Sequence, residues 1–450
     1  MTGNSESING LISLAKQVSE AILEYNNARV ISHNDADGIT SAAIICQALL
    51  RKNIYYHATI VSRLDEKVVE NVNNTTSKGD LVIFCDMGSG QPGLISDVSE
   101  STVVIDHHSP EGESAAKAVI NPHLLNIDGS VYLSASGTAY MVAREMEPSN
   151  VDLAGLAVAG AIGDKQLFKS ANRFILDEAV QKGIISTKKG LKIGEGDIAD
   201  LLENTPEPYL DISGDREKID EFLNSLNIHG NINNLKHEDF KRLASAITLK
   251  VIKNASIEAV DSVIGDVYTL NKECVQDIYE YVRILNACGK LKKGGLALTL
   301  SLRDSSVLEE AHQMSLEYNR NILDQIKDAE GLIQRGKNIR YLNTEGMDSI
   351  GIVAGVVVRY IYPDMPFVAT NEVEDVVKVS ARATHYLVKK GVDLNHAIRE
   401  AAKSCGGSGG GHNIASGAAI EKGQVENFIN IVDDIIGKQL KSDRESSDEN

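Results

Sequence analysis

The chain has 450 residues, of which 42% are hydrophobic and 24% are charged, which is ordinary for a folded globular protein and excludes disorder throughout. At roughly 150 residues per domain, this length predicts about three domains, or two domains with a large connector. The net charge is 45 − 63 = −18, which excludes a generally basic surface for nucleic acid but still allows a local phosphate site.

In chain order, the N-terminal half alternates strands with helices. A first segment, residues 1–27, contains an amphipathic helix at 10–25, and residues 28–195 then form an α/β domain with a parallel sheet. Two helices close this domain, and the second, VDLAGLAVAGAIGD, is apolar nearly all round and so should be buried. The predicted strands are ARVISH, IYYHATIVS, DLVIFCD, STVVID and KAVINP.

The C-terminal half is predicted to be a helical connector followed by a smaller α/β unit. Helical spacing dominates residues 196–340, strands return within 341–437, and the polar tail 438–450 is expected to be disordered. The smaller unit contains the glycine-rich stretch CGGSGGGHNIASGAAI. Its glycines would let backbone N–H groups approach a phosphate, and IASGAAI would open a helix that attracts anions. A flexible turn is the alternative reading.

The cysteines point to a reducing compartment. They are scattered and form no CxxC pair, which argues against disulfide and zinc–thiolate frameworks. The N-terminus lacks a signal-peptide pattern, and no apolar run reaches the roughly 18 residues of a membrane span. We therefore expect a cytoplasmic protein that does not contact membranes. The cysteines are Cys46, Cys85, Cys274, Cys288 and Cys405.

Acidic and imidazole side chains recur where predicted strands end. Three groups follow the first, third and fourth strands, and one further carboxylate closes the apolar helix. In an open α/β sheet the functional crevice lies outside the carboxyl ends of the strands, so four segments should bring ligands to one rim. The residues are His33, Asp35, Asp37, Asp86, Asp106, His107, His108 and Asp164.

This set of donors favours a two-metal site. Oxygen ligands with a few imidazoles suit Mn²⁺ or Mg²⁺ better than zinc. The ligands outnumber the needs of one ion, and they fit two ions about 3.5–4 Å apart that share a carboxylate. Such a pair activates water and neutralises the attacking and leaving oxygens, which is the chemistry of phosphoester hydrolysis.

Each part also has a purely structural interpretation. Asp35 or Asp37 would cap a helix after an Asx-rich turn, the DHH triplet would be a polar strand end, and Asp164 a helix-end carboxylate. The conjunction favours the metal site, because carboxylates at the ends of buried segments cost desolvation energy unless they are paired or metal-bound.

With its motifs in this order, the chain resembles the DHH phosphoesterase superfamily. The resemblance rests on the loop His33–Gly38 (HNDADG), on Asp86, on the triplet Asp106–His108 and on Asp164. The segments ILNACGKLKKGGLALTLSL and EYNRNI resemble RecJ-type exonucleases, and IGIVAGVVVRY, VSARAT and GGGHNIASGAAI resemble the DHH-associated C-terminal domain. The likeness covers roughly residues 28–425, and the absence of flanking domains resembles compact archaeal RecJ-like proteins of the GINS-associated nuclease type.

The resemblance implies two Mn²⁺ or Mg²⁺ ions and a role for each member of the set. His108 would contact the scissile phosphate or assist protonation, and Asp106 would orient its neighbours. One ion would be held by His33, Asp35 and Asp86. The second would be held by Asp37, Asp86, His107 and Asp164, with Asp86 bridging the two.

Substrate contacts are implied on two further segments. Lys290 stands where the family usually has arginine, which keeps the charge but loses bidentate phosphate geometry. We expect no counterpart of the OB-fold domain of bacterial RecJ, which helps to grasp single strands. The implied contacts are Asn286, Lys290, Ser380, Arg382, Gly410, Gly411 and His412.

The leading interpretation is an exonuclease that releases mononucleotides from single-stranded DNA or RNA, in replication or repair. Its active site would lie in a cleft between the DHH catalytic domain and the DHH-associated domain. One alternative is a nanoRNase-like phosphoesterase for short oligonucleotides or small molecules, which the long helical region disfavours. Another is a replisome component that binds GINS and the replicative helicase, with nuclease activity secondary; the complete ligand set disfavours a purely structural role.

Overall fold

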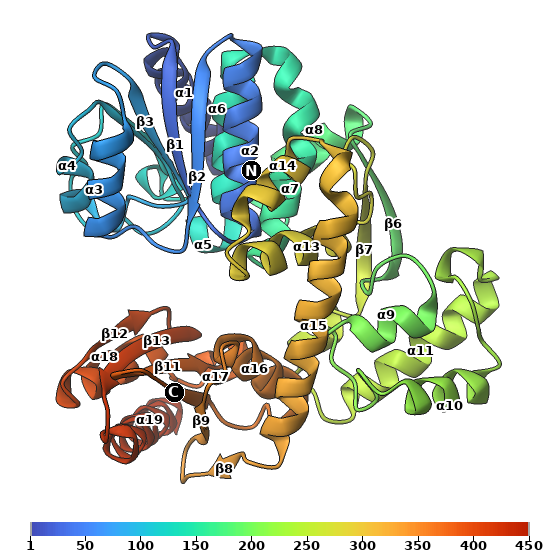
Figure 1. The fold of residues 1–450 in the computed structure, drawn as a ribbon. Coiled ribbons are helices and arrows are strands. Elements are labelled where there is room, and N and C mark those ends of the chain that lie inside the picture. Colours follow the sequence, from blue (N-terminus) through green and yellow to red (C-terminus); the bar gives the residue numbers. More distant parts are fainter. Residues whose placement is uncertain (1, 449–450) are drawn as a thin grey trace. The chain divides into compact units, whose positions relative to one another are not determined.

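The computed structural model describes residues 2–448, which form two compact units (Figure 1). Unit 1 comprises Met1–Lys188 and Val267–Leu316, and unit 2 comprises Lys189–Asp266 and Glu317–Asn450. The chain passes between the units in the paired strands β6 (Ile185–Leu191) and β7 (Ile264–Leu270) and in helix α15 (Leu308–Glu330). The predicted boundaries at 195 and 340 differ from this partition, because residues 267–316 of the predicted connector belong to unit 1.

Unit 1 is built on a five-stranded parallel sheet with the strand order β2-β1-β3-β4-β5. All five strands lie where the sequence predicts them. Ser32 pairs with Cys85, and Cys85 with Ile105, so β1, β3 and β4 end at nearly the same level. The strands are β1 Asn27–His33, β2 Tyr55–Val61, β3 Leu81–Cys85, β4 Thr102–Ile105 and β5 Ala118–Ile120.

Alternate side chains of the central strands fill two cores. Ile83 faces the larger core and Phe84 the smaller one, as the two-residue period of a strand requires. The apolar helix α7 is buried, as its sequence predicts. The larger core is covered by α1 (Thr2–Leu23), α2 (Ala36–Arg51), α6 (Ala135–Met146), α7 (Ala154–Gly163), α8 (Ser170–Gln181), α13 (Ile278–Lys290) and α14 (Gly294–Ser301). The smaller core is covered by α3 (Glu66–Thr75) and α4 (Pro92–Ser96).

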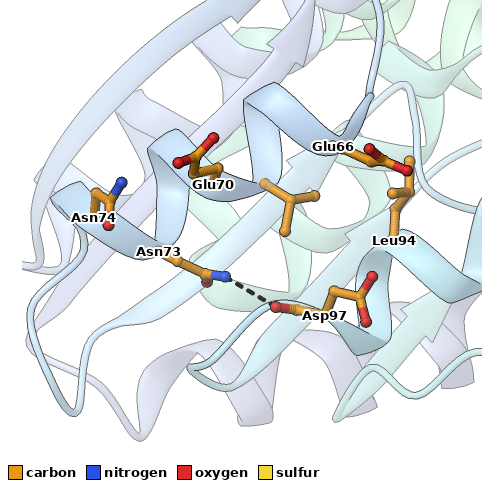
Figure 2. Close-up of a pocket in the computed structure, with 7 residues that line it drawn as sticks. Glu66, Glu70, Asn73, Asn74, Leu94 and Asp97 are labelled. Carbon is orange, nitrogen blue, oxygen red and sulfur yellow. Dashed lines mark hydrogen bonds between the residues drawn. The ribbon is translucent and has the colours of Figure 1, made fainter.

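A shallow hollow of about 390 Å³ lies between α3 and α4 (Figure 2). Asn73 Nδ2 donates to the carbonyl of Asp97 across it, at 2.9 Å. Its lining offers carboxylates but no imidazole or thiol, so it lacks the mixed donor set of the predicted metal site. The lining residues are Glu66, Val69, Glu70, Asn73, Asn74, Leu94 and Asp97.

Short elements connect the larger ones in unit 1. They are η1 (Pro122–Leu125), α5 (Gly129–Tyr132), η2 (Pro148–Leu153) and η4 (Ser305–Val307).

Unit 2 combines a helical region with a mixed sheet, and apolar side chains fill a core on each face of the sheet. The sheet has six strands in the order β12-β13-β11-β10-β9-β8, and only β9 and β10 are parallel neighbours. The strands are β8 Gln334–Arg335, β9 Arg340–Glu345, β10 Phe367–Val373, β11 Val376–Arg382, β12 Ser408–Gly411 and β13 Ala415–Glu421. The helices are α9 Ile198–Asn204, α10 Arg216–Leu226, η3 Ile232–Asn234, α11 His237–Ile252, α12 Ile257–Asp261, α16 Ile350–Val356, η5 Val357–Ile361, α17 His385–Lys389, α18 Leu394–Ser404 and α19 Val425–Asp448.

The glycine-rich stretch is a β-hairpin, so the prediction that IASGAAI opens a helix is wrong. Gly410 and Gly411 lie in edge strand β12, and IASGAAI continues into strand β13. The glycines serve close packing here: a Cβ on Gly411, which has a φ of +143°, would lie 2.6 Å from the carbonyl oxygen of Ala415. Glycine is depleted in strands, which is why the sequence favoured a loop.

The C-terminal segment 438–450 also differs from its prediction. Helix α19 continues through Asp448, whereas the sequence predicts disorder; residues 449 and 450 lie outside the described residues. Extending an existing helix avoids the cost of a new nucleus, and residues 438–448 contain no proline or glycine.

Candidate metal centre

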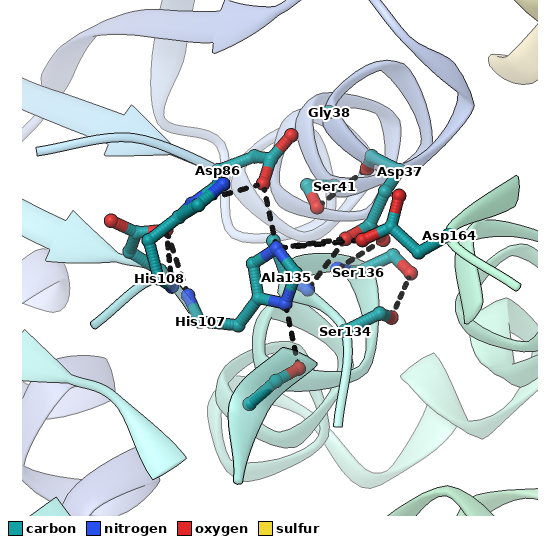
Figure 3. Close-up of polar contacts among 12 residues, drawn as sticks. Asp37, Gly38, Ser41, Asp86, His107, His108, Ser134, Ala135, Ser136 and Asp164 are labelled. Carbon is teal, nitrogen blue, oxygen red and sulfur yellow. Dashed lines mark hydrogen bonds and ion pairs between the residues drawn. The ribbon is translucent and has the colours of Figure 1, made fainter. Parts of the chain in front are cut away.

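The carboxyl ends of β1, β3 and β4 and the end of α7 meet in unit 1, and they bring the predicted ligands together. Figure 3 shows Asp37, Asp86, His107, His108 and Asp164 among them. Parallel strands of similar length end at one edge of their sheet, so residues far apart in sequence become neighbours there. Three overlapping groups have ligand atoms within 4.8 Å of one another. They are His33, Asp35 and Asp86; Asp37, His107 and Asp164; and Asp86, His107 and His108.

Asp86 stands at the centre of this arrangement. Its Oδ2 lies 3.3 Å from His33 Nδ1, and its Oδ1 lies 3.3 Å from His107 Nε2. Oδ1 is buried and accepts no hydrogen bond from the described residues. The backbone of Asp86 has a φ of +58°, a conformation that non-glycine residues adopt at a cost and that clusters at functional sites. A buried Asp86 carboxylate that lies between the imidazoles of His33 and His107, with one oxygen that accepts no hydrogen bond from residues 2–448, is suited to bind a cation.

His107 reaches the other carboxylates. Its Nε2 lies 3.5 Å from Asp164 Oδ2 and 3.9 Å from Asp37 Oδ2. The Asp37 carboxylate is fully buried, and its two oxygens accept hydrogen bonds from the backbone N–H groups of Ala135 and Ser136, at 2.7 and 2.9 Å (Figure 3). The first turn of α6 therefore holds Asp37 in place.

The pKa shifts show an excess of negative charge. Burial, and then the neighbouring Asp86 carboxylate, raise the pKa of Asp37 to about 6. Burial and the charge of Asp37 raise the pKa of Asp164 well above its usual value. At His33, burial opposes the charged form, but hydrogen bonds to Asp35 and Asp86 outweigh it and raise the pKa to about 10. Divalent cations would relieve this repulsion, and oxygen ligands with imidazoles suit Mn²⁺ or Mg²⁺.

Asp106 accepts hydrogen bonds that hold His107 and His108 in position. It is fully buried, and its Oδ1 accepts from the backbone N–H of His107 at 2.7 Å and from His108 Nδ1 at 2.8 Å. Its Oδ2 accepts from the backbone N–H of Ser89 at 2.9 Å. Asp106 therefore holds the His108 ring at Nδ1, while the side chain as a whole stays 48% exposed.

Three residues that the sequence analysis missed hold His107. Its Nδ1 donates to the carbonyl of Gly129 at 2.9 Å, which leaves Nε2 for a metal. Gln166 Nε2 donates to the same carbonyl at 2.8 Å, and Asn172 Nδ2 donates to Gln166 Oε1 at 2.8 Å. The position of Gln166, two residues after Asp164, was the only sequence signal for this chain of hydrogen bonds.

Replacing Gln166 with leucine is expected to weaken Mn²⁺ binding about 10-fold to 100-fold, as losses of outer hydrogen-bond partners usually do. Calorimetric titration of the metal-free protein would measure the change. Wild-type affinity in Gln166→Leu would show that Gly129 alone suffices to orient His107.

Mn²⁺ is expected to stabilise the folded chain. At about 100 times its dissociation constant, free Mn²⁺ would contribute about 2.7 kcal/mol. That corresponds to a rise in Tm of roughly 5–10 °C for a unit of this size. Thermal unfolding with Mn²⁺, with EDTA, and with K⁺ at matched ionic strength would measure the effect. An unchanged Tm at millimolar Mn²⁺ would argue against a metal centre.

The predicted substrate contacts are divided between the units. In unit 1, Asn286 Oδ1 accepts from the backbone N–H of Ala36 at 2.9 Å. Lys290 is exposed at the end of α13. Burial raises the pKa of Asp35, but the interaction with His33 and, to a smaller extent, the charge of Lys290 lower it below its usual value.

In unit 2, Ser380 and Arg382 lie on β11. Their side chains converge over Gly351, where an added Cβ would lie 3.2 Å from Ser380 Oγ and from Arg382 Nη2. Burial lowers the pKa of Arg382. Arg382 pairs with Ala415 of β13, and His412 occupies the turn between β12 and β13. The hairpin that contains Gly410 and Gly411 therefore adjoins Arg382 within unit 2.

Family models match an N-terminal and a C-terminal stretch of the chain. The model described as the DHH family, N-terminal domain, matches residues 27–161, and the DHHA1 domain matches residues 339–438. An uncharacterized protein of Methanocaldococcus jannaschii is 33% identical over 448 residues, which are 97% of this chain and 99% of that protein.

Two further likenesses concern named proteins. The single-stranded-DNA-specific exonuclease RecJ of Thermus thermophilus is 26% identical over 197 residues, which are 41% of this chain but only 29% of RecJ. Its structure in complex with Mn²⁺ matches with a TM-score of 0.63 and 16% identity, over 95% of this chain and 55% of that one. CDC45 of Entamoeba histolytica matches with a TM-score of 0.62 and 13% identity, over 97% and 99% of the two chains. At these identities the structural matches show a shared fold.

Proposed function

Because this chain belongs to the DHH superfamily and is RecJ-like, we propose that it is a metal-dependent phosphodiesterase that releases mononucleotides from an end of single-stranded DNA or RNA. The observation that carries the proposal is the central position of Asp86 between two groups of ligands. Bound Mn²⁺ or Mg²⁺ would supply an activated water and neutralise charge on the phosphate.

The residues divide the work as follows. His33 and Asp35 would hold one ion and Asp37, His107 and Asp164 the other, with Asp86 shared between them. His108, held at Nδ1 by Asp106, would use its exposed side to bind a phosphate oxygen or to protonate the leaving oxygen. The remaining proposed contacts, Lys290, Ser380, Arg382 and the glycine hairpin, would bind the nucleic-acid backbone.

The test is digestion of single-stranded DNA and RNA that are labelled separately at the 5′ and 3′ ends. We expect early release of a mononucleotide from one end with Mn²⁺, and no release with EDTA. A length series from two to thirty nucleotides would separate this activity from the alternative, a phosphoesterase for short oligonucleotides. Turnover of the shortest substrates only would favour the alternative.

Binding to GINS and the replicative helicase stays a prediction, since the likeness to CDC45 concerns the fold alone.

Among residues 2–448, no helix combines the length and the apolar character that a membrane span requires.

A further inference from the structure

The N-terminal end of α2 and the C-terminal end of α13 are hydrogen-bonded to each other beside the candidate metal centre. Asn286 Oδ1, on α13, accepts from the backbone N–H of Ala36, the first residue of α2, at 2.9 Å. Asn34 Nδ2 donates in return to the carbonyl of Gly289, in the last turn of α13, at 3.0 Å. These partners are 250 and 255 positions apart in the sequence.

The first bond satisfies a donor that the helix cannot satisfy itself, and the second adds a side-chain donor to the Gly289 carbonyl, which also accepts from the backbone N–H of Lys292 at 3.1 Å. First-turn N–H groups and last-turn carbonyls lack partners within their own helix. Asn286 supplies an acceptor to the start of α2, and Asn34 supplies a donor to the end of α13. Asp35 Oδ1 completes the cap by accepting from the backbone N–H of Gly38 at 3.0 Å. The two helices therefore cap each other.

The contact between the start of α2 and the end of α13 is too close to admit a side chain at Gly289. A Cβ on Gly289 would lie 1.6 Å from the carbonyl oxygen of Asn34, so only glycine allows this approach. Helix α13 also adjoins the end of α7, because a Cβ on Gly163 would lie 2.9 Å from Ala36 Cβ and 3.8 Å from Val282 Cγ1. Gly163 immediately precedes Asp164.

Between the two asparagine bonds lies a metal-ligand loop. Asp35 is flanked by Asn34 and Ala36, and Asp37 follows directly. We propose that Asn34 and Asn286 are positioning residues, which hold Asp35 and Asp37 in ligand geometry so that α13 sets the affinity of the site for divalent cations. This inference rests on the proposed function, and it gives Asn286 a role other than contacting the substrate.

Mn²⁺ titration by calorimetry, on the full chain freed of metal, tests the proposal. Asn286→Ala and Asn34→Ala are each expected to weaken Mn²⁺ binding about 10-fold to 100-fold. Asn286→Asp keeps an oxygen acceptor and should restore most of the affinity. Asn271→Ala is the matched control, because Asn271 Nδ2 donates to the carbonyl of Gly183 at 3.0 Å within the same unit. It should bind Mn²⁺ as the wild type does.

The outcomes separate this proposal from the proposed function. Wild-type Mn²⁺ affinity in Asn286→Ala, together with a raised KM for an oligonucleotide, would overturn it and make Asn286 a substrate contact. If Asn286→Ala fails to fold, Asn34→Ala tests the other bond of the same junction. A wild-type chain that binds Mn²⁺ but hydrolyses no phosphodiester would refute the proposed function, while the order of Mn²⁺ affinities would still decide the role of α13.

Discussion

Replacing Asp86 with alanine is expected to lower kcat/KM for single-stranded oligonucleotides by about 10³-fold or more. The two oxygens of Asp86 lie 3.3 Å from His33 Nδ1 and from His107 Nε2, which are assigned to different proposed ions, so its loss would remove a ligand from both. Its Oδ1 has no hydrogen-bond donor among the described residues, so the substitution should disturb the fold little. Initial rates with end-labelled substrate at saturating Mn²⁺ would measure the effect.

Asp97→Ala provides the matched control for this experiment. Asp97 is an exposed aspartate of the same unit, at the hollow between α3 and α4, and its replacement should leave the rate unchanged. Near-wild-type turnover in Asp86→Ala, with metal still bound, would refute the shared-ligand assignment.

The second large effect concerns the stability of unit 1. Arg303 forms a half-buried ion network: its Nη2 lies 2.9 Å from Glu273 Oε1, and its Nη1 lies 2.6 Å from Asp152 Oδ2. The Glu273 side chain is only 1% exposed. Asp152 keeps a second partner, because Arg51 binds both of its oxygens at 2.7 and 2.9 Å. The network joins α2, η2 and the segments on either side of α13 and α14.

Arg303→Ala is expected to lower the free energy of unfolding by about 3–5 kcal/mol, because it leaves a buried carboxylate without its cation. Arg51→Ala should cost less, since Asp152 retains Arg303 and is partly exposed. Urea unfolding of each variant, followed by circular dichroism, would measure the difference. Equal losses in the two variants would contradict a special role for Glu273.

The stability loss in Arg303→Ala should also depend on pH. Burial raises the pKa of Glu273 even beside Arg303, and removing the cation should raise this pKa further. An acid with a raised folded-state pKa binds protons more tightly when folded, so stability falls as pH rises from its unfolded-state pKa through its folded-state pKa. We therefore expect a larger loss at pH 8 than at pH 5. The double variant Arg303→Ala, Glu273→Gln should lose this dependence.

Much of the secondary structure of unit 1 could be predicted, because the sequence patterns that indicate its strands and helices are local. Apolar runs of strand length, separated by helical segments, predict the five parallel strands, and the ends of those strands predict which acidic and imidazole groups meet. The predictions of a helix at IASGAAI and of disorder from residue 438 onward are wrong, since β13 and the end of α19 occupy these segments. In both cases composition favoured a different structure, whereas packing of β12 on β13 and extension of an existing helix decided the structure.

Local pattern is enough to predict the candidate ligands, since the acidic and imidazole residues and their places after the strands can be read from the sequence. Tertiary structure alone decided how those donors are held. Gln166 reaches the carbonyl of Gly129, and Asn286 reaches the backbone of Ala36, through hydrogen bonds between segments far apart in the chain. A hydrogen bond of this kind leaves no periodic trace in either segment, because one backbone group and one amide side chain suffice to make it. Only the folded chain brings them together.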